Sequence, residues 1–187
     1  MVDTYIVVDI EASGWVPGEF SMLSIGACVA FDISKTFYVE LKPINEKYTK
    51  EAMEVNKLSF EKLKKEGKDP KEAMAMFEQW VIKVSGKNKP IFVAFPAVFD
   101  WSFVNYYFHR FLGRNPFERR VLEMKSYFAG KLGLSLEEAT RDKLFQIFPA
   151  TTKHTHVALD DAIAYAESFE RLLRYNNPNI MGKKIKS

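Results

Sequence analysis

Residues 6–11 read Ile-Val-Val-Asp-Ile-Glu, an apolar segment that ends in two carboxylates separated by one apolar residue. Side chains alternate faces along a β-strand, so Asp9 and Glu11 point to one side while Val8 and Ile10 point to the other. Acidic residues are depleted from strands, and two carboxylates aimed together repel each other unless a cation lies between them. Divalent cations such as Mg²⁺ prefer oxygen ligands. The segment predicts a buried strand that ends at a metal site; the alternative is an edge strand with two solvent-facing acids.

The size and composition of the chain are typical of one globular domain. It has 187 residues, of which 47% are hydrophobic and 27% charged, close to the averages for globular proteins. We expect one domain at residues 1–176 and a basic tail at 177–187. Cys28 is the only cysteine, which excludes an intramolecular disulfide and favours a reducing compartment. Asp3 and Asp9 interrupt any signal-peptide core, and no apolar run approaches the length of a membrane span. We therefore expect a cytoplasmic protein with no membrane partner.

The net charge of +3 is too small to identify a nucleic-acid-binding protein by itself. Basic residues nevertheless gather in three clusters, which permit a polyanionic substrate without requiring one. Such clusters are usually solvated helix faces or tails. They comprise Lys62, Lys64, Lys65 and Lys68; Arg110, Arg114, Arg119 and Arg120; and Lys183, Lys184 and Lys186.

The order of the expected elements predicts an α/β fold: a mixed sheet, made of a three-stranded antiparallel meander plus parallel strands, flanked by helices. Short turns join the first three strands, which makes them antiparallel neighbours. These strands are expected at 4–11, 21–31 and 36–42. Helices are expected at 50–58, 60–66, 70–84, 99–112, 123–132, 136–148 and 158–175, with further strands at 91–95 and around Val121.

A third carboxylate, Asp100, lies at the start of a helix, directly after the expected strand at 91–95 and among aromatic residues. Acids also favour the first turn of a helix for purely structural reasons, so helix capping is the alternative interpretation.

The last expected helix carries two adjacent aspartates with different neighbours. Both flank the buried apolar stripe of the helix at about equal angles. Asp160 shares its flank with charged residues such as Arg171, whereas Asp161 shares its flank with Tyr165 and other less polar residues. Asp161 is therefore the better candidate for a partly buried ligand.

A histidine precedes this helix. His156 lies five residues before Asp161, and five helical residues rotate by about 500°, or 140° net. His156 must therefore lie in the preceding loop if it is to reach the same site. His154, two residues earlier, is interpreted as incidental.

These residues together resemble the catalytic set of the DEDDh 3′→5′ exonucleases. This family belongs to the ribonuclease H-like superfamily and includes ribonuclease T, oligoribonuclease and polymerase proofreading domains. The resemblance spans residues 4–175. The matching motifs are Asp9-Ile10-Glu11, Phe99-Asp100-Trp101-Ser102-Phe103 and His156-Val157-Ala158-Leu159-Asp160-Asp161-Ala162, and Ser24-Ile25-Gly26-Ala27 is similar to the second strand of the family.

The resemblance implies a two-metal phosphodiester hydrolase. Two Mg²⁺ or Mn²⁺ ions would be held by Asp9, Glu11, Asp100 and Asp161. His156 would accept the proton of the attacking water. The substrates implied are the 3′ ends of single-stranded RNA or DNA, or short oligonucleotides, and the products are nucleoside 5′-monophosphates.

Family members also stack the terminal base on an apolar side chain just after the first motif. Trp15 is our candidate, with Met22 and Phe99 as further candidates for substrate binding, because base stacking stabilises single-strand binding. The alternative for Trp15 is an ordinary loop aromatic residue.

The chain departs from the family pattern at three places. It has Phe95-Pro96 where a His-Asn pair is usual, Ser24 where a Glu is usual, and Ala12 where a Thr is usual. None of these is a metal ligand, so we expect the chemistry to be kept and substrate preference to differ. Some relatives form homodimers in which a basic patch serves the partner's site, and the cluster at 62–68 could do this.

The sequence leaves two alternative functions open. The first is a non-catalytic module on the same fold that binds nucleic acid or protein. The second is a phosphatase of the haloacid dehalogenase type, with Asp9 as nucleophile. That class normally has a second Asp in place of Glu11, and it leaves the motif at 156–161 unexplained.

Overall fold

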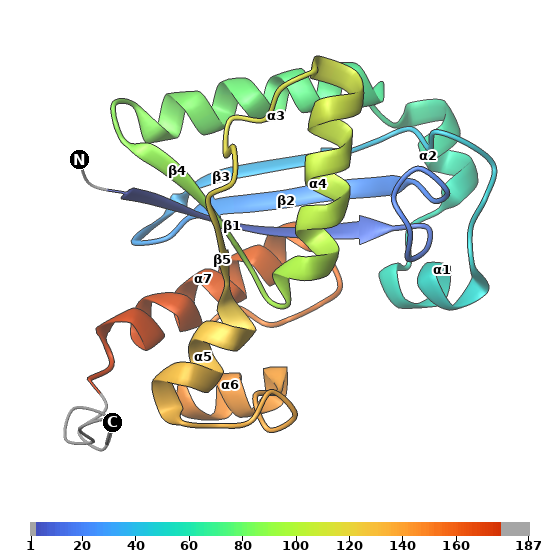
Figure 1. The fold of residues 1–187 in the computed structure, drawn as a ribbon. Coiled ribbons are helices and arrows are strands. Elements are labelled where there is room, and N and C mark those ends of the chain that lie inside the picture. The colour runs from blue at the N-terminus through green and yellow to red at the C-terminus, as the bar shows by residue number, and fades with distance from the viewer. Residues whose placement is uncertain (1–2, 177–187) are drawn as a thin grey trace, which may run out of the picture.

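The computed structural model describes residues 3–176, and its centre is a five-stranded mixed sheet with helices on both faces (Figure 1). Strands β1 (Asp3–Ala12), β2 (Met22–Val29) and β3 (Asp32–Glu40) form the antiparallel meander. Strands β4 (Lys89–Ala94) and β5 (Val121–Glu123) continue the sheet in parallel on the other side of β1, in the order β3-β2-β1-β4-β5. The predicted α/β fold is confirmed. The predicted tail at 177–187 lies outside the described residues.

The helices form two layers, one on each face of the sheet (Figure 1). Helices α3 (Pro70–Ser85) and α4 (Ala97–Leu112) cover one face, and α7 (Ala158–Arg174) covers the other together with α5 (Met124–Leu132) and α6 (Arg141–Ile147). Helices α1 (Lys50–Asn56) and α2 (Phe60–Glu66) lie near the carboxyl end of β1. Across residues 3–176, none of the helices combines the length and the apolar character needed to cross a membrane.

Strand β1 lies at the centre of the sheet and alternates its side chains as predicted. Val8 and Ile10 are buried in the core cluster beneath α3 and α4. Val7 belongs to the cluster beneath α7. Asp9 and Glu11 share the face of Val7, because every second residue points the same way. The two acids therefore emerge together near the carboxyl end of β1, where β2 still pairs with the strand and β4 no longer does.

Helix α6 differs most from its predicted bounds; the ends of α1 and α4 differ by two residues, and the third strand begins at Asp32 instead of Thr36. The pattern predicted a helix at 136–148, but α6 begins only at Arg141. The backbone N–H and the hydroxyl of Ser135 both donate to the Glu138 carboxylate at 2.9 Å, which closes a turn instead of a helix. Thr140 then caps α6 by accepting a hydrogen bond from a backbone N–H of its first turn. Local side-chain bonds thus override helical spacing here.

The core beneath α3 and α4 is built from aromatic rings around Phe77. The Phe77 side chain is fully buried. Its ring centroid lies between 5.0 and 6.2 Å from those of four neighbours, namely Phe37, Trp80, Phe108 and Phe117. These rings come from β3, α3, α4 and the segment after α4, so they join the sheet to both helices of this layer.

We expect Phe77→Ala to lower the free energy of unfolding by about 3–5 kcal/mol, because it leaves a cavity among four rings. Urea denaturation followed by circular dichroism measures this change. Met76→Ala is the matched control on the same helix. Its side chain is 41% exposed, and we expect a change below about 1 kcal/mol. Equal effects of the two substitutions would contradict the central role of Phe77.

Candidate active site

A close approach between α7 and the sheet positions the site. A Cβ atom on Gly26 of β2 would lie 2.2 Å from the carbonyl carbon of Ala158 and 2.2 Å from the nitrogen of Leu159. No other residue fits there, so glycine allows the first turn of α7 to rest on the strand backbone. Gly26 pairs with Asp9 across the antiparallel ladder. The contact therefore brings Asp161, in the first turn of α7, close to the acids of β1.

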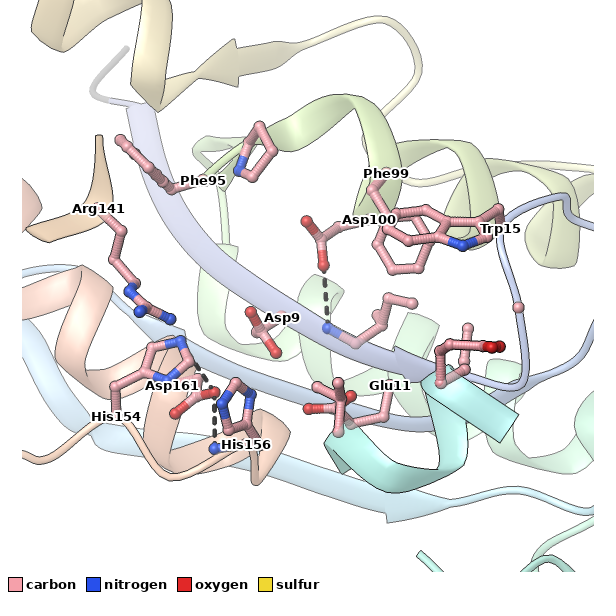
Figure 2. A pocket seen from close by; sticks show the side chains of 17 residues that line it. Asp9, Glu11, Trp15, Phe95, Phe99, Asp100, Arg141, His154, His156 and Asp161 are labelled. Carbon is pink, nitrogen blue, oxygen red and sulfur yellow. Dashed lines mark hydrogen bonds and ion pairs between the residues drawn. The ribbon is translucent and has the colours of Figure 1, made fainter. Parts of the chain in front are cut away.

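The structure brings the four predicted carboxylates together in one cavity of about 510 Å³ (Figure 2). Asp9, Glu11 and Asp161 each offer an oxygen atom, and these atoms lie within 4.8 Å of one another. Asp100 enters from the first turn of α4, where its Oδ1 accepts a hydrogen bond from the backbone N–H of Ile10 at 3.0 Å. This bond ties α4 to the end of β1 and explains why Asp100 faces the cavity.

Burial raises the pKa of each of these acids, and repulsion from neighbouring carboxylates adds to the effect at Asp9 and Glu11. Burial raises the pKa of Asp9 well above its usual range, and the charges of Asp100, Glu11 and Asp161 add to the effect. The pKa of Glu11 rises to about 8 and that of Asp100 to about 7, in both cases chiefly through burial. Burial also raises the pKa of Asp161. Four carboxylates in one cavity, two of them buried and two half-buried, are a set of oxygen donors that Mg²⁺ or Mn²⁺ fits.

His156 lies in the loop before α7, as predicted from its angle to Asp161. The Thr155 N–H donates to Asp161 Oδ1 at 2.7 Å, and the His156 N–H donates to Oδ2 at 3.1 Å. These bonds hold His156 at φ 62°, a left-handed conformation that is uncommon outside glycine. Both His156 and Asp161 line the cavity. Asp160 does not line it and accepts a hydrogen bond from the Thr155 hydroxyl at 2.9 Å.

The interpretation of His154 as incidental is wrong. Its Nε2 lies 3.2 Å from Asp161 Oδ2, and its ring centroid lies 4.9 Å from that of His156 (Figure 2). Burial lowers the pKa of His154, although the Asp161 carboxylate opposes this change. The sequence did not indicate this contact, because it depends on how the loop turns at Thr155 and His156. The spacing between His154 and Asp161 along the chain does not reveal that turn.

Two of the three predicted substrate-binding residues line the cavity. The Trp15 side chain is 75% exposed, and its ring lies edge-to-face on Phe99 with centroids 5.6 Å apart. The prediction for Met22 is wrong, because its side chain is fully buried in the core. A register shift between Glu11 and Ala12 sets Ala12 opposite Met22, and both side chains then pack in the core cluster on the α3–α4 face.

Sequence reasoning also missed Glu51, Val55 and Arg141, which line the same cavity. The first two lie on α1 and the third on α6, helices far from the acids along the chain. No pattern within those helices marks them as part of a site. Two of the departures from the family pattern lie near the acids. Pro96 is exposed and lines the cavity. Ser24 is buried in β2, where it pairs with Glu11 across the antiparallel ladder.

The comparisons with known proteins agree with this geometry. A family model for exonucleases (RNase_T) matches residues 6–169. The chain is also similar to the 3′-5′ DNA exonuclease Cap18 of Escherichia coli. The two are 45% identical over 168 residues, which are 89% of this chain and 90% of the relative.

Solved structures share the fold at lower sequence identity. The nuclease domain of 3′hExo, a DEDDh family member bound to rAMP, matches with a TM-score of 0.73 and 15% identity over 92% of each chain. Cell-death related nuclease 4 matches with a TM-score of 0.72 and 18% identity; the match covers 96% of this chain and 64% of that one. Exonuclease I of E. coli in complex with a dT13 oligonucleotide matches with a TM-score of 0.71 and 14% identity. The match covers 96% of this chain and 43% of that one. At these identities the likeness shows the fold, which is the ribonuclease H-like fold predicted from the sequence.

We expect Gly26→Ala to lower the free energy of unfolding by about 3 kcal/mol, because the added methyl group meets backbone atoms that cannot rotate away. Denaturant titration measures the loss. Gly130→Ala on α5 is the matched control: no atom lies within 4 Å of its added Cβ. A helical Gly→Ala change of this kind is expected to stabilise by up to about 1 kcal/mol. A neutral Gly26→Ala would show that α7 does not rest on β2.

We expect the metal-free protein to lose stability as the pH rises from about 4.5, the ordinary pKa of Glu11, to about 8, its pKa in the fold. Between these values the folded state keeps a proton that the unfolded state releases, so the free energy of unfolding falls. Glu11→Gln should make this slope shallower in unfolding measured with a chelator present. Glu54→Gln, an exposed change on α1, should keep the wild-type slope. A slope unaffected by Glu11→Gln would contradict the burial of its charge.

Proposed function

The chain belongs to the exonuclease family whose model it matches over residues 6–169, and we propose that it removes nucleotides one at a time from the 3′ ends of single-stranded DNA. The observation that carries this proposal is the convergence of Asp9, Glu11, Asp100 and Asp161 in one cavity beside two histidines. The name of the 45% identical relative, a 3′-5′ DNA exonuclease, supports both the direction and the choice of DNA.

Asp9, Glu11, Asp100 and Asp161 would hold two Mg²⁺ or Mn²⁺ ions, since their donors are all oxygens and their charges repel one another until a cation is bound. Such ions, when bound, lower the pKa of an attacking water and stabilise the leaving 3′ oxygen. The number and identity of the ions are part of our proposal.

The remaining steps fall to residues around the acids. His156 would accept a proton from the water while the water oxygen attacks phosphorus. The bond between phosphorus and the 3′ oxygen of the remaining strand then breaks. The phosphate stays on the 5′ oxygen of the released nucleotide, and the 3′ oxygen takes up a proton from solvent. The hydrogen bond from the His156 backbone to Asp161 sets the position of this imidazole relative to the acids. Trp15 and Phe99 would hold the terminal base by stacking, which contributes about 1–3 kcal/mol per base.

The two alternatives receive less support. A haloacid dehalogenase phosphatase does not agree with the family match. Against a non-catalytic module stands the fact that the predicted acids and His156 are all present and all line the cavity. A module without activity has no need to bury four carboxylates together, because their repulsion destabilises the fold.

The cellular setting is a further part of the proposal. The one cysteine, Cys28, is a buried free thiol, which suits the cytoplasm. A homodimer that uses the basic cluster at 62–68 finds little support, because acidic neighbours neutralise most of the cluster. Its ion pairs are Lys62–Glu66, Lys64–Glu46, Lys64–Glu61 and Lys68–Glu72.

We expect the protein to shorten a 5′-labelled single-stranded DNA from its 3′ end when Mg²⁺ or Mn²⁺ is present, and to release nucleoside 5′-monophosphates. Asp161→Asn should lower kcat by about 10²–10³-fold, because it removes one charged ligand and disturbs the loop of His156. Asp160→Asn, a matched change outside the cavity, should retain activity. Gel electrophoresis and mass spectrometry of the products measure both effects.

An RNA strand of the same sequence tests the substrate class. Faster trimming of RNA than of DNA would contradict the choice of DNA and leave the exonuclease activity in place. Failure to release nucleotides from either strand, or full activity in Asp161→Asn, would contradict the proposed function itself. Protection of the strand without product would identify the binding module instead.

A further inference from the structure

The active-site cavity continues into a second cavity beside it. Phe95, Pro96 and Arg141 line both of them. The second cavity measures about 360 Å³, and its lining is completed by Thr140, Asp142 and Tyr165. A strand that extends beyond the acids on this side therefore has a place to lie.

This second cavity and the aromatic pair Trp15 and Phe99 lie on opposite sides of the acids. Figure 2 shows Phe95 and Arg141 on one side of Asp9, and Trp15 and Phe99 on the other. Under the proposed function, the terminal base lies on Trp15 and Phe99 and the phosphate to be cut lies at the acids. The next nucleotide of the strand must then leave the acids on the side of Arg141.

Arg141 is well suited to meet a phosphate there. Among the described residues that line the active-site cavity, it is the only arginine or lysine, and its side chain points toward the group of acids and histidines in Figure 2. Its Nε lies 3.2 Å from Asp142 Oδ1, with the two side chains 44% and 85% exposed. Exposed pairs of this kind contribute little stability. Exchanging the Asp142 contact for a phosphate that accepts two guanidinium N–H groups is therefore favourable.

Stacked aromatic rings support one wall of the second cavity. The Phe95 ring stacks on Tyr165 at 5.5 Å and 18°, and Tyr165 stacks on Phe145 at 5.4 Å and 23°. Pro96, which follows Phe95, exposes its ring to both cavities. An exposed apolar ring beside a guanidinium matches the two parts of a nucleotide, its base or sugar and its phosphate.

We propose that Arg141 and Pro96 form a subsite for the penultimate nucleotide, in which Arg141 binds the phosphodiester immediately 5′ of the one that is cut. This inference rests on the proposed function. It gives a role to the Phe95-Pro96 departure: a cation from α6 and an apolar ring replace the polar pair usual in the resembled family.

Neutralising a single phosphate tests the subsite. Two single-stranded DNA oligonucleotides of one sequence are compared, one natural and one with a methylphosphonate at the second linkage from the 3′ end. In the wild-type protein, the neutral linkage should lower kcat/KM for release of the first nucleotide by about tenfold, because a charge-assisted contact is lost. On the natural strand, Arg141→Gln should lower kcat/KM by about the same factor. In this variant, the neutral linkage should lower kcat/KM by less than about twofold further.

Lys143→Gln is the matched control, since it removes one positive charge from the same helix without lining either cavity. It should keep the wild-type activity and the wild-type sensitivity to the neutral linkage. Arg141→Lys, which keeps the charge but not the fork of N–H groups, should fall between wild type and Arg141→Gln.

The inference is overturned if Arg141→Gln remains as sensitive to the neutral linkage as the wild type, or if the wild type is insensitive to it. Both results are read from a protein that still trims natural DNA, so they leave the proposed function intact. A wild-type protein that trims neither oligonucleotide would instead reject the proposed function together with the subsite.

Discussion

Repulsion among four carboxylates that share one cavity is the interaction on which the arrangement of this molecule depends. Asp9 and Glu11 lie near the carboxyl end of β1, where β2 pairs with both residues and β4 pairs only as far as Val7. Asp100 is held by the backbone N–H of Ile10, and Asp161 by two N–H groups of the loop before α7. Backbone N–H groups thus orient Asp100 and Asp161, and His154 is the basic side chain in contact with Asp161. A bound cation would offset the charges that the four acids bring together.

The opposite face of the sheet supplies the stability that this cavity removes. Beneath α3 and α4, the side chains of Phe77, Phe108 and Phe117 are fully buried and pack ring against ring. On the α7 side, small residues such as Gly26 and Ala158 allow close backbone approach. The α7 face also contains packed rings, such as those of Phe128 and Phe148, but it is the face on which β1 and α7 bring Asp9, Glu11 and Asp161 into a small space. Natural proteins commonly accept strain at the site and compensate for it elsewhere.

Much of the site could be predicted from the sequence because the rules that place it are local. Strand alternation put Asp9 and Glu11 on one face, and helical angles put His156 in the loop. What failed depends on longer-range or side-chain geometry. A register shift turned Met22 into the core, and a left-handed residue brought His154 back to Asp161. Arg141 reaches the cavity from a helix whose position depends on the packing of the whole α5–α6 layer, which no local pattern encodes.

The exposure of Trp15 has a practical consequence for watching this protein at work. The chain has three tryptophans, and the other two, Trp80 and Trp101, are packed against the core. Trp15 is the one whose ring faces solvent, at the rim of the cavity. Its fluorescence should therefore respond when a strand end covers the ring, while the two core tryptophans provide a steady background. The molecule carries an intrinsic optical probe of substrate arrival, which can be followed in stopped-flow experiments without a dye.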